Sequence, residues 1–175
     1  MKNLVSIMLL ATSAIAFGQV KWLTLDQALA MQKTSPKKII INFYSSQSSQ
    51  CDKMEKDTYG NPVISEIINN KFYPVRFNIN SDEEVFFKGK SYKKYSSKEK
   101  NNPNTHSFAK FMNISTVPTV VFLDENIEPI TNLMGPLTAK DVEPYFNMIS
   151  TNAYKNIKTR EQWDNYQKKF KSKIK

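Results

Sequence analysis

The side chain with the richest chemistry in this 175-residue chain is Cys51, the only cysteine. It follows a polar turn, SSQSSQ, which in turn follows an apolar run of strand length. A single thiol cannot form a disulfide within the chain. Cys51 is therefore either buried and unreactive, or accessible for a mixed disulfide with an external thiol. At this point both readings stay open.

Other residue types that bind metals or nucleic acids are sparse. His106 is the only histidine and has no cysteine or second histidine at ligand spacing, so we expect no metal and no other cofactor. The net charge is +9, and residues 155–175 carry much of it, but almost every basic residue is lysine. Nucleic-acid readers favour arginine for its bidentate fork, so we expect no nucleic-acid partner.

The first 18 residues have the layout of a secretory signal peptide. Lys2 is their only charge, the run Leu4 to Phe17 is apolar, and Ala16-Phe17-Gly18 has the small-x-small form of a cleavage site. The run is too short and too interrupted for a stable membrane span of about 20 residues. We therefore expect cleavage after Gly18 and an exported protein, periplasmic or secreted.

Several elements must position Cys51. The run Lys38 to Tyr44 reads as a buried strand, and a helix should run from near Ser48 through Glu55. The pattern also predicts a short strand at 20–22, further strands at 73–80, 119–123 and 128–134, and helices at 24–35, 62–70, 106–112, 138–149 and 159–170. This order predicts an α/β domain with a mixed sheet over residues 19–150. Residues 81–104 form an insert with a possible hairpin around Gly89, and residues 151–175 form a basic helical extension.

Four stretches carry a resemblance to a known family: IIINFYSSQSSQCDKMEKDTY, FYPVRFNIN, ISTVPTVVFLD and LMGPLTAKDVEPYF. They resemble the thioredoxin superfamily, and in particular exported thioredoxin-like proteins related to the C-terminal periplasmic domain of thiol–disulfide interchange proteins. In this comparison Cys51 and the residues Met54, Glu55, Thr58 and Tyr59 match the second motif cysteine and its downstream helix. Val117-Pro118-Thr119 matches the cis-proline loop, and Gly135 matches the glycine before the last helix. The resemblance implies a thioredoxin-like fold.

Three departures from the family pattern concern chemistry. Ser48 stands where the nucleophilic cysteine is expected, Gln47 replaces the preceding tryptophan, and Asn42 replaces a buried carboxylate. Disulfide exchange begins with thiolate attack, which a serine hydroxyl cannot perform. Serine is a strong N-cap, so Ser48 is better explained as a helix cap. We therefore expect no self-contained dithiol cycle.

The resemblance leaves two functions open. One is a degenerate member of the thiol–disulfide exchange class, which binds protein substrates or a redox partner through Val117, Pro118, Gln47 and the Ser48–Cys51 turn. The other is a monothiol redox protein in which Cys51 forms mixed disulfides with an external thiol. In both, the partner is a protein or peptide thiol or disulfide. The family loop implies a cis Val117–Pro118 bond, and the insert reads as a solvated hairpin or a flap over the site.

Overall fold

The computed structural model describes residues 18–94 and 105–175. Its main sheet has the strand order β2-β1-β5-β6. Strand β1 (Ile39–Tyr44) is parallel to β2 (Tyr73–Asn78) and antiparallel to β5 (Thr119–Leu123), which pairs antiparallel with β6 (Pro129–Met134). The predicted α/β fold with a mixed sheet is confirmed. The expected signal peptide lies outside the described residues except for Gly18, as do residues 95–104 of the insert.

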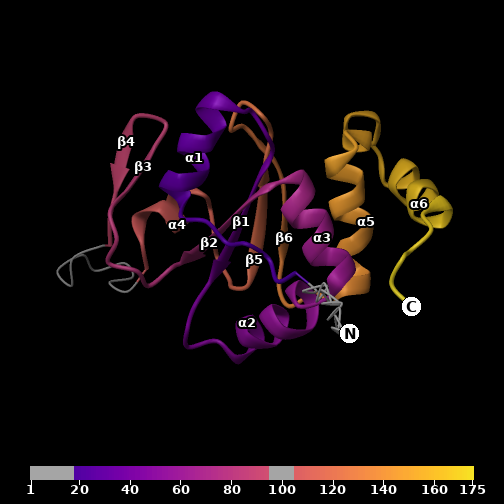
Figure 1. The fold of residues 1–175 in the computed structure, drawn as a ribbon, viewed down its shortest axis with the longest axis horizontal. Coiled ribbons are helices and arrows are strands. Elements are labelled where there is room, and N and C mark those ends of the chain that lie inside the picture. The colour runs from indigo at the N-terminus through magenta and orange to yellow at the C-terminus, as the bar shows by residue number, and fades with distance from the viewer. Residues whose placement is uncertain (1–17, 95–104) are drawn as a thin grey trace, which may run out of the picture.

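Helices cover both faces of this sheet (Figure 1). On one face lie α3 and α5, and on the other lie α1, α4 and the hairpin of β3 and β4, while α6 packs outside α5. Their bounds are α1 (Leu25–Thr34), α2 (Ser49–Met54), a π-helical turn (Glu55–Tyr59), α3 (Pro62–Lys71), β3 (Val85–Phe87), β4 (Lys90–Tyr92), α4 (Ser107–Phe111), α5 (Ala139–Ser150), a 3-10 turn (Ala153–Asn156) and α6 (Arg160–Lys169).

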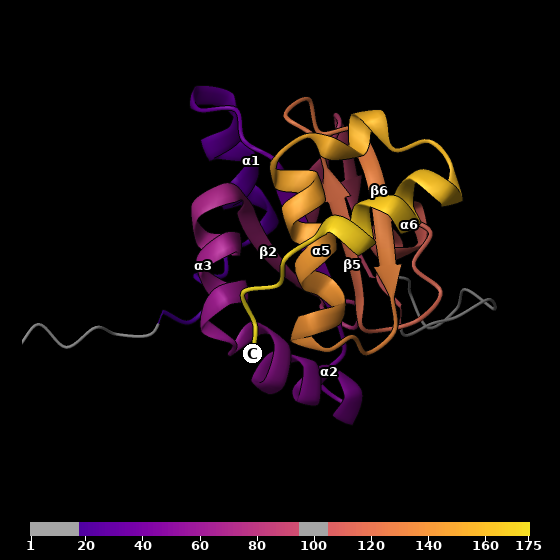
Figure 2. The same cartoon turned by 90° about the vertical axis from the view of Figure 1, so that its right-hand side faces the viewer.

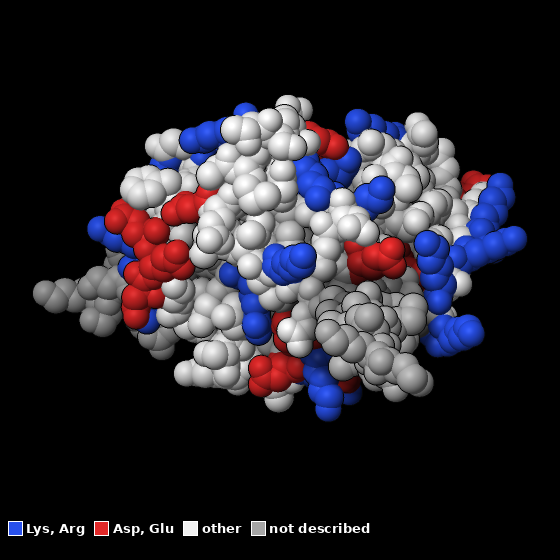
Figure 3. Space-filling view, in the orientation of Figure 1, with Lys and Arg blue, Asp and Glu red and all other residues white. Residues whose placement is uncertain are grey.

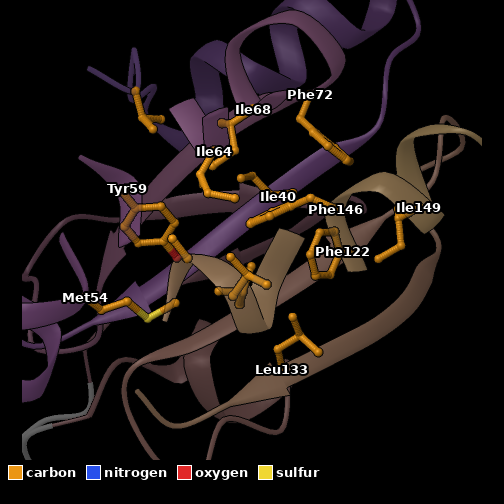
Figure 4. Packing of buried hydrophobic residues seen from close by; sticks show 14 of the residues in the cluster. Ile40, Met54, Tyr59, Ile64, Ile68, Phe72, Phe122, Leu133, Phe146 and Ile149 are labelled. Carbon is orange, nitrogen blue, oxygen red and sulfur yellow. The ribbon is translucent and has the colours of Figure 1, made fainter. Parts of the chain in front are cut away.

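The side chains of β1 alternate between two apolar cores, as the strand period of two requires. Ile40 packs with Phe122 and Phe146 in the core under α3 and α5 (Figure 4). Ile39, Ile41 and Phe43 belong to the core on the opposite face. Because both faces are covered, the strand is apolar almost throughout, which explains its clear sequence signal.

The predicted helix starts are confirmed, while the predicted strand at 20–22 is wrong. Thr24, Thr138 and Thr159 are N-caps in capping boxes, and Asn61 caps a helix with Pro62 in its first turn. Between residues 18 and 24, the described part of the N-terminal segment, the one bridge joins Leu23 to Val75. This segment runs along the outer edge of β2, where the Leu23 N–H donates to the Pro74 carbonyl (2.8 Å).

The insert contains the predicted hairpin. Lys88 and Gly89 both have positive φ (48° and 76°), as the two central residues of a tight hairpin turn require. Phe87 and Tyr92 face the body and lie 5.3 and 5.6 Å from the Phe108 ring, measured between ring centroids. The described part of the insert is therefore a hairpin with one packed apolar side.

The buried environment of His106 predicts that the stability of the protein depends on pH. Its ring is fully buried, Nδ1 accepts the Phe108 N–H (3.0 Å), and Nε2 lies 2.7 Å from the Glu83 carbonyl, to which it donates. Burial lowers the pKa of His106, although the Glu83 carbonyl and the Glu83 and Asp82 carboxylates oppose the shift. The unfolded chain therefore binds this proton first, and the free energy of unfolding should fall as pH drops below 6.5.

Urea unfolding at pH 7.5, 6.5 and 5.5 measures this effect. His106→Asn keeps a side-chain N-cap acceptor but does not titrate, so its stability should change less over the same range. If the free energy of unfolding changed equally with pH in the two proteins, the pH dependence could not be assigned to His106.

Candidate functional site

One end of the sheet gathers the residues that the sequence singled out. Phe43 near the end of β1 pairs with Thr119 at the start of β5, so the turn after β1 and the Val117–Pro118 loop leave the sheet at the same end. The Ile79 N–H donates to the Tyr44 carbonyl (2.9 Å), which brings the end of β2 to the same place. The Gly135 N–H donates to the Pro118 carbonyl (2.9 Å) and adds the end of β6.

Ser48 is the N-cap of α2. Its backbone is extended, and its hydroxyl lies 3.4 Å from the Cys51 nitrogen and accepts that N–H. The Ser48 carbonyl also accepts the same N–H, with the Cys51 nitrogen 3.0 Å away. Two hydrogen bonds therefore link Ser48 to the backbone of Cys51. The side chain at position 48 thus has a structural role that requires no activated hydroxyl.

Cys51 lies in the first turn of α2 and points inward. Only 4% of its surface is exposed. Thiol–disulfide exchange requires the sulfur to reach a disulfide on the partner, so access to this thiol requires local opening. The structure therefore favours the unreactive reading over the accessible one.

Asn42 lies in β1 between Arg76 of β2 and Val120 of β5. Its side chain is buried, and its Oδ1 has no hydrogen-bond partner in residues 18–94 and 105–175. The family pattern that this chain resembles has a carboxylate at this position, which can take a proton, whereas an amide oxygen cannot. The strand beneath the motif therefore offers no proton acceptor at this position.

A group of polar side chains lies next to the Ser48–Cys51 turn and the start of the π-helical turn. The sequence did not predict that these residues come together. Glu55 follows Cys51 by one helical turn, accepts from Trp22 Nε1 (3.0 Å), and faces Arg76 with Nε and Oε2 3.6 Å apart. The Arg76 guanidinium also lies 4.1 Å from the centre of the Tyr44 ring. One signal was present, because Arg76 is the single charged residue of a mostly apolar strand.

Tyr59 completes this group. Its ring meets that of Trp22 edge-on, with centroids 4.9 Å apart, and its hydroxyl is buried without a hydrogen-bond partner in the described chain. Burial, reinforced by the nearby Glu55 and Cys51, raises the pKa of Tyr59 far above its ordinary value. The hydroxyl therefore stays protonated and neutral.

Removing this hydroxyl should stabilise the protein. A buried polar group without a partner costs about 1–3 kcal/mol, so Tyr59→Phe should raise the free energy of unfolding by about 1 kcal/mol. Tyr73→Phe is the matched control, because the Tyr73 hydroxyl donates to the Ser35 carbonyl (2.9 Å). That variant should lose about 1 kcal/mol. Urea unfolding of both variants measures the difference, and destabilisation by Tyr59→Phe would show that its hydroxyl is satisfied.

The surface beside the motif consists of the loop before β5 and the end of β6. The Val117–Pro118 bond is cis. Val117 is half-buried, Gln47 is exposed, and 58% of Met134 is exposed. The Thr119 hydroxyl donates to the Thr116 carbonyl (2.8 Å) and holds the loop. The structure thus brings the predicted site residues Gln47, Ser48, Cys51, Val117 and Pro118 to one end of the sheet.

The described residues also bear on metal ligation and on membrane spanning. Across residues 18–94 and 105–175, no three acidic, histidine or cysteine side chains come together as ligands for a metal ion. The helices of these same residues are all too short or too polar to cross a bilayer.

Comparison with known proteins identifies the family. Residues 25–149 match the thioredoxin-like domain family, which is well over half of the chain. This chain belongs to the thioredoxin-like domain family. Among curated proteins, none matches it.

Solved thioredoxin folds are similar to this chain. A thioredoxin-fold protein from Helicobacter pylori has a TM-score of 0.60 at 19% identity, over 76% of this chain and 81% of its own. A thioredoxin from Thermus thermophilus has a TM-score of 0.57 at 16% identity, over 75% and 88%. An oxidoreductase named DsbH has a TM-score of 0.52 at 16% identity, over 88% and 96%. These likenesses show the shared fold.

Proposed function

We propose that this protein is a degenerate, exported member of the thiol–disulfide exchange class that binds polypeptides non-covalently. The observation that carries the proposal is the burial of Cys51, the only thiol of the chain.

Export is proposed because the first 18 residues resemble a signal peptide. Mass spectrometry of the exported protein should find a chain that begins at Gln19. A full-length cytosolic chain would contradict it.

The absence of dithiol chemistry follows from three positions. Ser48 caps the helix where the resemblance expects a nucleophilic thiol, and serine cannot form the mixed disulfide. Asn42 cannot accept a proton, and buried Cys51 has no second thiol with which to close a disulfide. The family scaffold therefore keeps its shape while the redox step is lost.

Binding is the function that this surface still supports. Val117 and Met134 present apolar surface at the end of the sheet, and exposed Gln47 adds an amide that can donate and accept hydrogen bonds. An extended polypeptide can pair with the backbone of such a loop while its side chains contact these residues. The partner class is an unfolded or extended segment of another protein.

The test uses a thiol-free probe, a reduced and carboxymethylated unfolded protein, titrated into the full chain by isothermal calorimetry. Val117→Asp should weaken binding about tenfold, because it places a charge in an apolar contact. Phe86→Asp is the matched control, since Phe86 is 59% exposed on the distant hairpin and should have little effect. If this probe does not bind, while the same protein with its disulfides intact binds the wild type but not Cys51→Ala, the result would instead establish the monothiol function.

A further inference from the structure

Strand β6 is an open edge of the main sheet. The opposite edge, on the outer side of β2, is partly covered by the N-terminal segment through the bridge from Leu23. No segment within the described ranges pairs with the outer side of β6. Figure 2 shows β6 as the outermost strand, beside α5 and α6. An open edge carries backbone donors and acceptors that an extended chain can use.

The pairing with β5 identifies which groups of β6 point outward. The Gly135 N–H donates to the Pro118 carbonyl, so these two residues form a hydrogen-bonded pair. In an antiparallel ladder the hydrogen-bonded pairs alternate with non-hydrogen-bonded pairs, here Met134 with Thr119 and Asn132 with Val121. The N–H and C=O groups of Asn132 and Met134 therefore face away from β5.

The strand lacks the charges that usually protect an edge. No charged residue occurs between Glu128 and Lys140, in a chain with 25 basic and 16 acidic residues. Edge strands commonly carry lysine or inward charges that prevent pairing with other chains. Here Pro129 and the register shift at Phe122 and Leu123 protect only the first part of β6. Its second part, from Thr131 to Met134, remains open.

A groove flanks β6 on each face of the sheet. The first, which we call the α6 groove, lies between β6, α5 and α6 and has a volume of about 540 Å³. Its wall is aromatic: the ring centroids of Tyr145 and Trp163 lie 4.4 Å apart with the planes tilted by 30°, and Tyr154 also lines the groove. The second, the α4 groove, has a volume of about 390 Å³ and is lined by Phe111, Met112 and Val121. Pro129, Ile130 and Thr131 line both grooves.

This arrangement matches the needs of an added strand. Successive side chains of a strand point to opposite faces, so a segment paired with β6 would place alternate side chains in the two grooves. Main-chain hydrogen bonds then supply affinity, and the grooves select the side chains.

Charge indicates the chemistry of the segment. Exposed Lys158 lines the α6 groove, and no acidic side chain pairs with it in the described structure. Asp124 lines the same groove, but its carboxylate accepts the N–H groups of Asn126 and Glu128, both at 2.8 Å. Figure 3 shows lysine and arginine side chains gathered at the α6 end of the molecule. A second copy paired through β6 would place two such basic ends on the same side of a joined sheet, so like charges disfavour it.

We propose that β6 binds an extended segment of a partner protein as a fifth strand of the sheet. The segment carries a large apolar or aromatic side chain for the α6 groove and an acidic residue next to it for Lys158. This site lies along the outer edge of β6, shares only Met134 with the surface beside the Ser48–Cys51 turn, and does not rest on the proposed function above.

The test begins with phage display of random 12-residue peptides on the wild-type protein. In the enriched peptides, apolar and polar residues should alternate, proline should be absent, and an acidic residue should stand beside an aromatic one.

Substitutions at Asn132 then test whether the edge of β6 binds a selected peptide. Asn132→Pro removes an outward N–H and should weaken binding about tenfold or more, as measured by fluorescence polarisation. Asn132→Asp keeps the backbone donor but places a negative charge on the edge, which repels the acidic segment, so it should weaken binding as well. Because it does not disturb the backbone, it shows the loss of binding even if the proline variant fails to fold. Asn126→Asp adds the same charge in the β5–β6 turn and is the control.

Amide hydrogen exchange with the selected peptide gives the direct readout. Binding should slow exchange at Asn132 and Met134, whereas Phe86→Asp on the distant hairpin should leave the affinity unchanged. Three results would overturn the proposal: no enriched peptides, peptides insensitive to both Asn132 substitutions, or a dimer of the free protein that Asn132→Pro dissociates. The last would assign the edge to a second copy.

Discussion

Ser48→Cys should convert the protein from inactive to active in insulin reduction. Residues 48 and 51 span the first turn of α2, where Cα atoms fall within the range of about 4.4–6.8 Å that a disulfide needs. The thiol introduced at position 48 would lie at the helix N-terminus, where free N–H groups lower the pKa of a thiol. It could then attack a substrate disulfide, and Cys51 would resolve the mixed disulfide from within.

A second variant separates the contribution of the nucleophile to the rate from that of the proton acceptor. Adding Asn42→Asp to Ser48→Cys restores the buried carboxylate of the family pattern and should raise the rate by about tenfold or more. The matched control is Asn42→Asp alone, which lacks the attacking thiol and should stay inactive. Insulin turbidity with dithiothreitol measures all four proteins. Turnover by the wild type would show that a lone thiol suffices, and an inactive Ser48→Cys would show that more than the nucleophile is missing.

Much of the fold was predictable because its signals are local. The run Lys38 to Tyr44 is buried on both faces and is apolar for that reason. The capping residues Thr24, Asn61 and Thr159 act within their own first turns, so the sequence alone locates those helices. The N-terminal strand was predicted wrongly because only Leu23 reaches the edge of β2.

The polar group behind the motif could not be predicted in this way. Trp22 and Glu55 are 33 residues apart and meet only because the N-terminal segment runs along β2. Arg76 reaches Glu55 across the space between β2 and the π-helical turn, and neither that turn nor its geometry has a sequence signal. The two grooves beside β6 depend likewise on how α4 and α6 pack, which no local pattern specifies.

Burial of Cys51 is the central claim, because it separates a binding protein from a monothiol enzyme. With 4% of its surface exposed, the thiol should react with a reagent only when α2 opens locally. The native protein should therefore label at least about a hundredfold more slowly than the protein in denaturant.

The measurement is the labelling rate of Cys51 with a chromogenic disulfide reagent at neutral pH, in the native protein and in 6 M guanidinium chloride (about the concentration that unfolds most domains). A variant with an added surface thiol, Ser49→Cys, provides the rate of an exposed thiol on the same helix. In that variant we predict that the thiol at position 49 labels rapidly and that Cys51 labels slowly. In the wild type we predict only the slow labelling of Cys51. Fast labelling of native wild-type Cys51 would contradict the account and establish an accessible monothiol.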